Sequence, residues 1–380
     1  MEKLSNLFKN RIVLILFLFV ISRTLLTIFG VDSRNLPQFK SNPWYEWKNS
    51  DIPALDIWSV WDSSWYLDIA RNGYSPEPKT DIPKSCCGQA NYAFYPLYPY
   101  SIRFLAILFK NHYLIGLAVS NICLLIASYF LHKLVSKQYS RGVADGTLIF
   151  LYLFPTAFVF SGFFSESMFL MLLILSFYFA DKNKWFLSGF FGFLMSLTRS
   201  IGVFVSIALL WEYLRQRGFN YKKLDKNFFS FLFYPLGPIL MMFIMYRLTG
   251  DFLAHIHLEH SSWGVNFTNP FQTLFSTLFM KTNISIISLY TFWLFVLLAF
   301  NLKAIKFSYF ILSMILLTAP LTIGDVGMVS MLRYSIVVFP IPLILALKIK
   351  SNLITAALVL ILAILQLTFM GFWSNGLFII

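Results

Sequence analysis

Charged side chains are scarce in this sequence. Only 12% of its 380 residues are Asp, Glu, Lys or Arg, whereas a soluble globular domain carries roughly 25%. Half that density cannot cover the surface of a soluble protein of this size. Hydrophobic residues make up 58% of the chain instead, and the mean hydropathy is +0.69. The composition therefore predicts an integral membrane protein whose helices face lipid or one another.

Cysteine and the familiar nucleotide-binding motifs are also missing or rare. The chain has 3 Cys, of which Cys86 and Cys87 are adjacent, and this gives neither a disulfide framework nor a CxxC metal pair. A P-loop, a GxGxxG segment opening a helix after a strand, and a GxSxG elbow are all absent. The sequence therefore shows no site for nucleotide-driven chemistry, and no cofactor is expected.

The net charge of +13 comes from short basic clusters between apolar runs, not from one patch. This is the positive-inside pattern of membrane proteins, so nucleic acid is not expected as a partner. Six clusters hold more than half of the 30 basic residues: Lys3/Lys9/Arg11, Lys133/Lys137/Arg141, Lys182/Lys184, Arg215/Arg217/Lys222/Lys223/Lys226, Lys303/Lys306 and Lys348/Lys350.

All six clusters can face the cytoplasm if the segment 94–109 does not cross the membrane. That segment is short and carries Arg103 and two prolines, and we interpret it as an interfacial or re-entrant helix. We interpret the first apolar run, 12–29, as a retained span, since no small-residue cleavage site follows it. The prediction is an all-α transmembrane bundle, one domain over 1–380. It has about eleven spans of a ~30 Å core, some short or broken, with the N-terminus inside.

Under this topology a long loop, 31–93, lies outside. It holds nearly half of the 17 acidic residues and is rich in Trp, Tyr and Pro. A simple connection between two spans would be much shorter, and long loops with their own aromatic content more often carry function. A solvated loop without a role is the alternative.

Two charged residues fall in hairpins that point outward. Arg199 lies midway between Lys184 and Arg215, and two helices of about 14 residues reach only ~21 Å each, so it sits at an outer turn. A buried arginine needs an anionic partner. Glu166, at the tip of the preceding hairpin, and a ligand phosphate are the candidates. A packing ion pair, or a glutamate that merely begins its helix, remains the structural alternative.

Two further outer segments are polar. Asp251 leads into a stretch with three of the five histidines, followed by Trp263. The histidine spacing is not HExxH and no single helix face gathers all of them, which favours the polar rim of a cavity over a metal site. The second segment puts Arg333 and Tyr334 at the outer end of a span, where an interfacial anchor is the alternative.

Several of these segments share a pattern with a known family. Residues 61–74 (WDSSWYLDIARNGY) resemble the WDxxxYxxIAxxGY signature of the PIG-V family, and 93–99 (AFYPLYP) resemble its AFFPLYP element. Segments 154–158, 165–167, 196–200, 250–264 and 330–334 follow in matching order over about residues 12–347. The family includes the second mannosyltransferase of GPI-anchor synthesis.

The resemblance implies a GT-C glycosyltransferase that takes its sugar, expected to be mannose, from a polyprenyl phosphate. Its acceptor would be a lipid-linked or glycan hydroxyl on the non-cytoplasmic face. The family's acidic residue corresponds to Asp62. The membrane would be the plasma membrane in a prokaryote or the endoplasmic reticulum in a eukaryote.

The residues suit that chemistry independently. A carboxylate such as Asp62 can accept the proton of the acceptor hydroxyl, and Arg199 and Arg333 can stabilise the leaving phosphate. We therefore expect an inverting transfer that needs no metal ion. The remaining candidates for substrate binding or support are Trp61, Trp65, Tyr66, Glu166, Asp251, His257, Trp263 and Tyr334.

Two other classes compete with the enzyme. A transporter or lipid flippase also has broken helices and buried charges, but its polar groups lie near the midplane and its halves are often repeated. The WD and TRS segments have no second copy here. A non-catalytic scaffold would be favoured if Asp62 were remote from any site.

Overall fold

The computed structural model describes residues 10–39, 49–77, 88–280 and 282–377. Lys3, Lys9, Cys86, Cys87 and part of the loop 31–93 lie outside the described residues. Every regular element in the described ranges is a helix, which confirms the all-α prediction.

In the first half of the chain, the described residues form eight α-helices and three 3₁₀ turns. They are α2 (Arg11–Ser33), η1 (Pro37–Phe39), α3 (Pro53–Asp56), α4 (Ser63–Asn72), η3 (Asn91–Ala93), α5 (Leu97–Phe109), α6 (His112–Gln138), α7 (Arg141–Tyr152), η4 (Ala157–Ser161), α8 (Glu166–Asp181) and α9 (Trp185–Ser196). Side chains of Asn10, Asn111 and Ser140 accept backbone N–H groups at the starts of α2, α6 and α7. Such N-caps satisfy donors that have no partner within the helix.

The second half continues in the same way. It contains η5 (Ser200–Val203), α10 (Val205–Gln216), η6 (Tyr221–Lys223), η7 (Lys226–Phe233), α11 (Leu236–Thr249), α12 (Ala254–Trp263), α13 (Pro270–Leu278), α14 (Asn283–Phe300), α15 (Phe307–Leu321), α16 (Asp325–Val329), α17 (Met331–Tyr334), η8 (Ser335–Val337), α18 (Pro340–Lys348) and α19 (Asn352–Ser374). Ser351 caps α19, and Asn269 caps α13. Pro270 is the first residue of α13, where the N–H that proline lacks would have no partner within the helix.

Five helices in the described ranges are long and apolar enough to span a membrane. They are α2, α6, the continuous helix Lys226–Thr249, α14 and α19. The pair Met331–Val337 and Pro340–Lys348, bent by 72°, would make a sixth. The expected count of about eleven spans of a ~30 Å core needs the shorter helices as well, and it stays a prediction.

Helix α8 forms the centre of the bundle. Nearly all of its side chains are buried, and it packs between α6 and α9. An apolar helix surrounded on all sides belongs in a core. In contrast, most apolar side chains of α14 and α19 are exposed or only partly buried, as expected of helices that face lipid.

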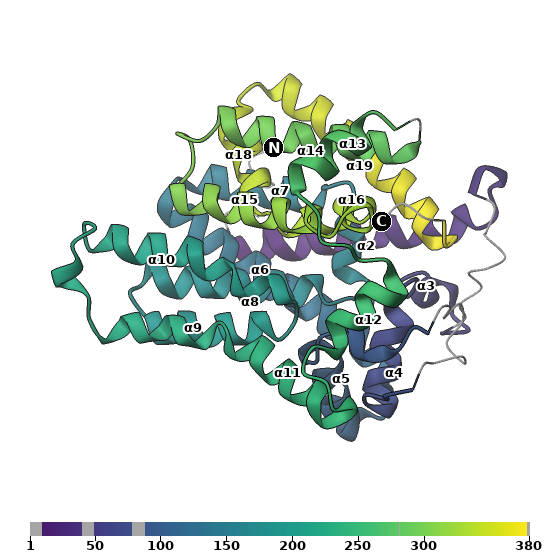
Figure 1. Cartoon of the computed structure of the whole chain (residues 1–380). Helices are drawn as coiled ribbons and strands as arrows, with labels where there is room; N and C mark the ends of the chain where they lie inside the picture. Colours follow the sequence, from purple (N-terminus) through teal and green to yellow (C-terminus); the bar gives the residue numbers. More distant parts are fainter. Residues whose placement is uncertain (1–9, 40–48, 78–87, 281, 378–380) are drawn as a thin grey trace.

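The predicted cytoplasmic clusters meet at one end of the bundle. Asp181 binds Lys137 at 2.6 Å and Lys306 at 3.3 Å, and Glu212 binds Arg215 at 2.6 Å. Lys306 also reaches Glu212 at 3.7 Å. The connection between α10 and α11 lies beyond this end, at the left of Figure 1, while α3, α4 and α12 lie at the right.

The described part of the outer loop is packed against the bundle. Trp373 Nε1 donates to the Ile57 carbonyl at 2.9 Å, and the Phe163 amide donates to the Trp58 carbonyl at 2.9 Å. Tyr113 Oη donates to the Leu55 carbonyl at 2.6 Å. These bonds hold α3 and the residues just after it against the ends of α6 and α19, so this part is not a solvated loop.

Candidate active site

The chain turns sharply just before α4. Trp61 has φ of +56°, in the left-handed region that bulky residues rarely adopt. Such a conformation costs about 1–3 kcal/mol and persists where surrounding contacts enforce it. The turn puts Asp62 at the N-cap position, yet its side chain does not cap the helix. The carboxylate stays 27% exposed and is available for other contacts.

Arg333 provides the main contact to Asp62. Its Nη1 donates to Asp62 Oδ2 at 2.6 Å, although the two residues are 271 positions apart. The Arg333 side chain is 11% exposed, and its guanidinium lies 5.5 Å from the Phe164 ring and 5.2 Å from the Tyr334 ring. The predicted base and a predicted phosphate-binding cation therefore touch each other.

Glu166 and Arg199 form a second ion pair. Arg199 Nη1 donates to Glu166 Oε1, as the sequence suggested for the two hairpin tips. Glu166 is only 2% exposed, so this pair lies beneath the surface. Arg199 also lies over the Tyr334 ring at 4.8 Å.

The two pairs join into one row of charges. Arg333 Nε lies 3.5 Å from Glu166 Oε1, which gives the order Asp62, Arg333, Glu166, Arg199. The row is balanced in charge, which offsets the cost of burying each ion. Glu166 Oε2 has no hydrogen-bond partner among the described residues.

Contacts between segments fix the turn that carries Arg199. The Leu97 amide, at the start of α5, donates to the Leu197 carbonyl at 3.0 Å. A Cβ on Gly237 would lie 2.1 Å from Ser196 Oγ, so α11 can approach this turn only with glycine at that position. The AFYPLYP and TRS segments of the sequence therefore form one structural unit.

Aromatic side chains wall the site on the α4 side. Trp65 stacks on Phe94 at 6.0 Å between ring centroids, and Trp263 meets both rings edge-on at 5.7 and 6.0 Å. The Tyr66 hydroxyl lies 3.1 Å from Ser165 Oγ, next to Glu166 in the chain. Trp263 of α12 thus lies against Trp65 of α4, and the expected substrate contacts of Trp65, Tyr66 and Trp263 remain a prediction.

The other nearby acids are engaged elsewhere. Asp68 accepts from the side chains of Asn91 at 2.5 Å and Asn72 at 2.7 Å. Asp56 accepts both terminal guanidinium nitrogens of Arg34 at 3.1 Å. Both are buried and bind structural partners, so Asp62 is the acid of this loop that meets the charge row.

The three histidines of α12 have different partners and do not form one cluster. His257 Nδ1 lies 2.6 Å from Asp251 Oδ2 in an exposed pair, and His260 Nδ1 lies 2.8 Å from the Val265 carbonyl. His255 packs edge-on against Tyr95, and burial lowers its pKa to about 4. No group of three or more His, Cys, Asp or Glu among the described residues could hold a metal ion. Substrate contacts of Asp251 and His257 remain a prediction.

The sequence alone did not single out Glu259 of α12. Burial raises its pKa to about 7, and the charge of Arg199 opposes that rise. This coupling puts a third carboxyl, besides Asp62 and Glu166, within electrostatic reach of the charge row. The only feature of the sequence that marks Glu259 is its position between His257 and His260, a pattern that suggests metal ligands more than a perturbed carboxyl.

Comparison with known proteins gives no sequence-level match. No family model matches the chain, and no curated protein matches it either. The resemblance to the PIG-V family is therefore not confirmed. Solved structures, in contrast, do match it.

One is ArnT from Cupriavidus metallidurans, in a crystal structure with bound undecaprenyl phosphate. The TM-score is 0.57 at 12% identity, over 91% of this chain, which spans 62% of the ArnT chain. Another is an oligosaccharyltransferase from Archaeoglobus fulgidus, with a TM-score of 0.45 at 11% identity, over 95% of this chain and 56% of that one. The chain is thus an integral membrane protein with a GT-C glycosyltransferase fold.

Proposed function

We propose that this protein is a GT-C glycosyltransferase. It transfers a sugar, mannose in the specific form of the proposal, from a polyprenyl phosphate to a hydroxyl of a lipid-linked or glycan acceptor on the non-cytoplasmic face. The contact of Asp62 with Arg333 carries the proposal, because it joins a partly exposed carboxylate to a cation suited to phosphate.

The donor phosphate would bind where Asp62 now lies on Arg333. A guanidinium can hold two phosphate oxygens at once, and Arg199 lies on the same row to assist. Binding of the phosphate would release Asp62 from its ion pair. The released carboxylate can then accept the proton of the acceptor hydroxyl.

The reaction then follows from these positions. Asp62 takes the proton from the acceptor hydroxyl, whose oxygen attacks the anomeric carbon of the sugar from the face opposite the phosphate. The bond from that carbon to the phosphate oxygen breaks, and its electron pair leaves with the phosphate. A single displacement inverts the anomeric configuration. The two arginines supply the positive charge that a metal ion would otherwise provide.

The fold and the aromatic wall support this function. The ArnT crystal structure contains undecaprenyl phosphate, a lipid of the class proposed here as the donor carrier. Phe94 and Trp263 are partly exposed, and a sugar can pack against their rings, which the buried Trp65 supports from behind. A flippase is the alternative, but the charge row begins at Asp62, in the loop that the sequence predicts to lie outside, which favours the transferase.

A transfer assay tests the proposal. Purified protein is incubated with several polyprenyl-phosphate sugars and a membrane lipid extract, and the products are identified by mass spectrometry. Transfer from at least one donor, with mannose preferred, is the expected result. Movement of lipids between leaflets without any new glycosidic bond would favour the flippase instead.

A further inference from the structure

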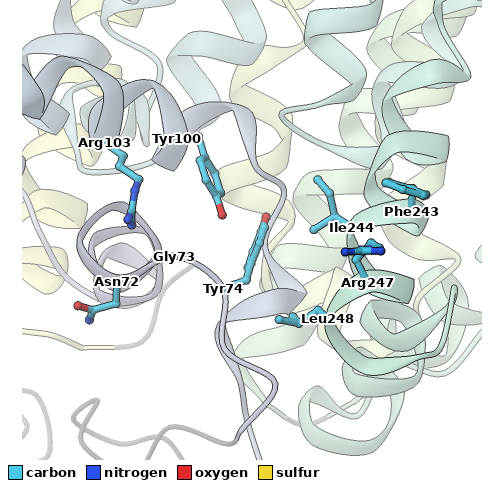
Figure 2. Close-up of a pocket in the computed structure, with 9 residues that line it drawn as sticks. All are labelled: Asn72, Gly73, Tyr74, Tyr100, Arg103, Phe243, Ile244, Arg247 and Leu248. Carbon is cyan, nitrogen blue, oxygen red and sulfur yellow. The ribbon is translucent and has the colours of Figure 1, made fainter.

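A cavity of about 470 Å³ lies apart from the charge row. It opens where the C-terminal end of α4, the first turns of α5 and the outer end of α11 come together (Figure 2). Asn72, Tyr100, Arg103, Phe243, Ile244 and Arg247 line it, among others.

Its polar lining is positively charged. Arg103 and Tyr100 extend from one wall and Arg247 from the opposite one, with Tyr74 between them (Figure 2). Among the described residues, no acidic side chain lines the cavity. Arg103 makes one hydrogen bond within the described ranges, to the Arg71 carbonyl at 3.2 Å. That bond uses one of its five N–H groups.

Arg247 has a different environment. No hydrogen bond or ion pair joins its side chain to another described residue. It lies in the last turn of the span Lys226–Thr249, where positive charge suits the helix dipole but needs no other partner. Arg103, Arg247 and the exposed Arg71 gather at the outer end of the bundle, which is the side that the positive-inside rule depletes of such residues.

Part of the lining is apolar, and exposed apolar side chains continue from it along α5 and α11. Phe243 and Ile244 belong to the same span as Arg247, and Phe243 is 56% exposed. On α5, Phe104 and Ile107 are 69% and 73% exposed. The cavity thus combines two guanidinium groups with an apolar surface that continues into the bilayer.

We propose that this cavity binds the phosphate group of a membrane lipid. Arg103 and Arg247 hold the phosphate oxygens from two sides, and the lipid chains lie along Phe243 and Ile244. Guanidinium groups are well suited to phosphate, because the fork of N–H donors matches its oxygens. A phospholipid of the outer leaflet and a polyprenyl monophosphate share this chemistry.

The site is distinct from the proposed donor site. Asp62 lies at one end of α4 and Asn72 at the other, and a helix of ten residues is ~15 Å long. The lipid site does not depend on the proposed glycosyl transfer.

Native mass spectrometry of the detergent-solubilised full chain tests the proposal. The probes are short-chain phosphatidylglycerol, a short-chain polyprenyl monophosphate and, as the zwitterionic control, phosphatidylcholine of matched length. The key variant is Arg247→Gln, since Arg247 contacts no other polar group in the described structure and its loss should leave folding intact. Arg103→Gln/Arg247→Gln removes both cations. Lys222→Gln/Lys223→Gln removes two exposed charges at the opposite end.

The native protein should bind phosphatidylglycerol more tightly than phosphatidylcholine. Losing a charge-assisted contact should weaken that binding at least about tenfold in Arg247→Gln, and further in the double variant. If polyprenyl monophosphate is the natural ligand, the double variant should lose one bound molecule of it while phosphatidylglycerol binds weakly throughout. Unchanged binding of both anionic probes in the double variant, or an equal loss in Lys222→Gln/Lys223→Gln, would overturn the proposal.

Discussion

Arg333 and Asp62 meet at 2.6 Å across 271 positions of sequence. Arg333 lies in the first part of the bent helix pair Met331–Val337 and Pro340–Lys348, and Asp62 immediately precedes the short helix α4 in the loop 31–93. The contact therefore ties the loop to the membrane domain at the point where the chemistry is proposed. It also implies an exchange, since a donor phosphate and Asp62 would compete for the same guanidinium.

Removal of either arginine tests that exchange. In Arg199→Ala and Arg333→Ala, a lost charge-assisted contact costs about 1.5–3 kcal/mol, or about 10- to 150-fold in the constant for donor use. Initial rates against donor concentration measure this loss. Lysine at either position should restore it only in part, because its point charge lacks the guanidinium fork.

Folding must be controlled in the same experiment. Glu166 is 2% exposed and would lose a partner in either alanine variant, so thermal unfolding should be measured beside the kinetics. Kinetics equal to those of the native protein in both alanine variants would make these arginines packing residues only.

Stability should depend on pH through Glu259. Burial raises the pKa of this residue from 4.5 to about 7, so the folded chain keeps a proton that the unfolded chain has released. Stability from this group is therefore full at low pH and falls as pH rises from about 4.5 to 7, after which it is level. The melting temperature of the native protein should drop more between pH 5 and 8 than that of Glu259→Gln. Equal drops would contradict the expected burial.

The orientation of the bundle is open to chemical labelling. In a background without the three native cysteines, a cysteine at Asn266 should react with an impermeant thiol reagent on intact cells. One at Asn220 should not, since it lies beyond the end where Asp181 binds Lys137 and Lys306. Both positions are exposed, so access differs only by side of the membrane. Labelling at Asn220 alone would reverse the topology.

Much of the site could be predicted because local sequence sets it. A short apolar helix must turn back, so Arg199 and Glu166 had to lie at hairpin tips, and a buried arginine needs an acid. Their ion pair follows from these two constraints. The helical class followed from composition in the same way.

Other features depend on tertiary packing and leave no local trace. The contact of Asp62 with Arg333 joins segments with no periodic relation in sequence. Glu259 is perturbed by burial that a single sequence does not record. His257 pairs with Asp251 instead of joining its neighbouring histidines, because α12 spreads those side chains over different faces. The number of spans could not be predicted either, because the sequence of a short apolar helix does not show whether it crosses the membrane.

Asp62 is the residue on which the catalytic proposal depends. Asparagine keeps its size and can still accept the hydrogen bond from Arg333, but it cannot accept a proton. Base catalysis is worth about 10²–10⁴-fold, so Asp62→Asn should cut turnover at least about a hundredfold while donor binding and unfolding stay near native. Asp68→Asn is the matched control, because Asp68 binds Asn91 and Asn72 away from the charge row. Turnover of Asp68→Asn should change far less, whatever the substitution does to stability.

Chelators should not affect the native enzyme if the arginines alone stabilise the leaving phosphate. An active Asp62→Asn enzyme would move the base elsewhere, and Glu166, with one carboxylate oxygen unpartnered among the described residues, would be the next candidate.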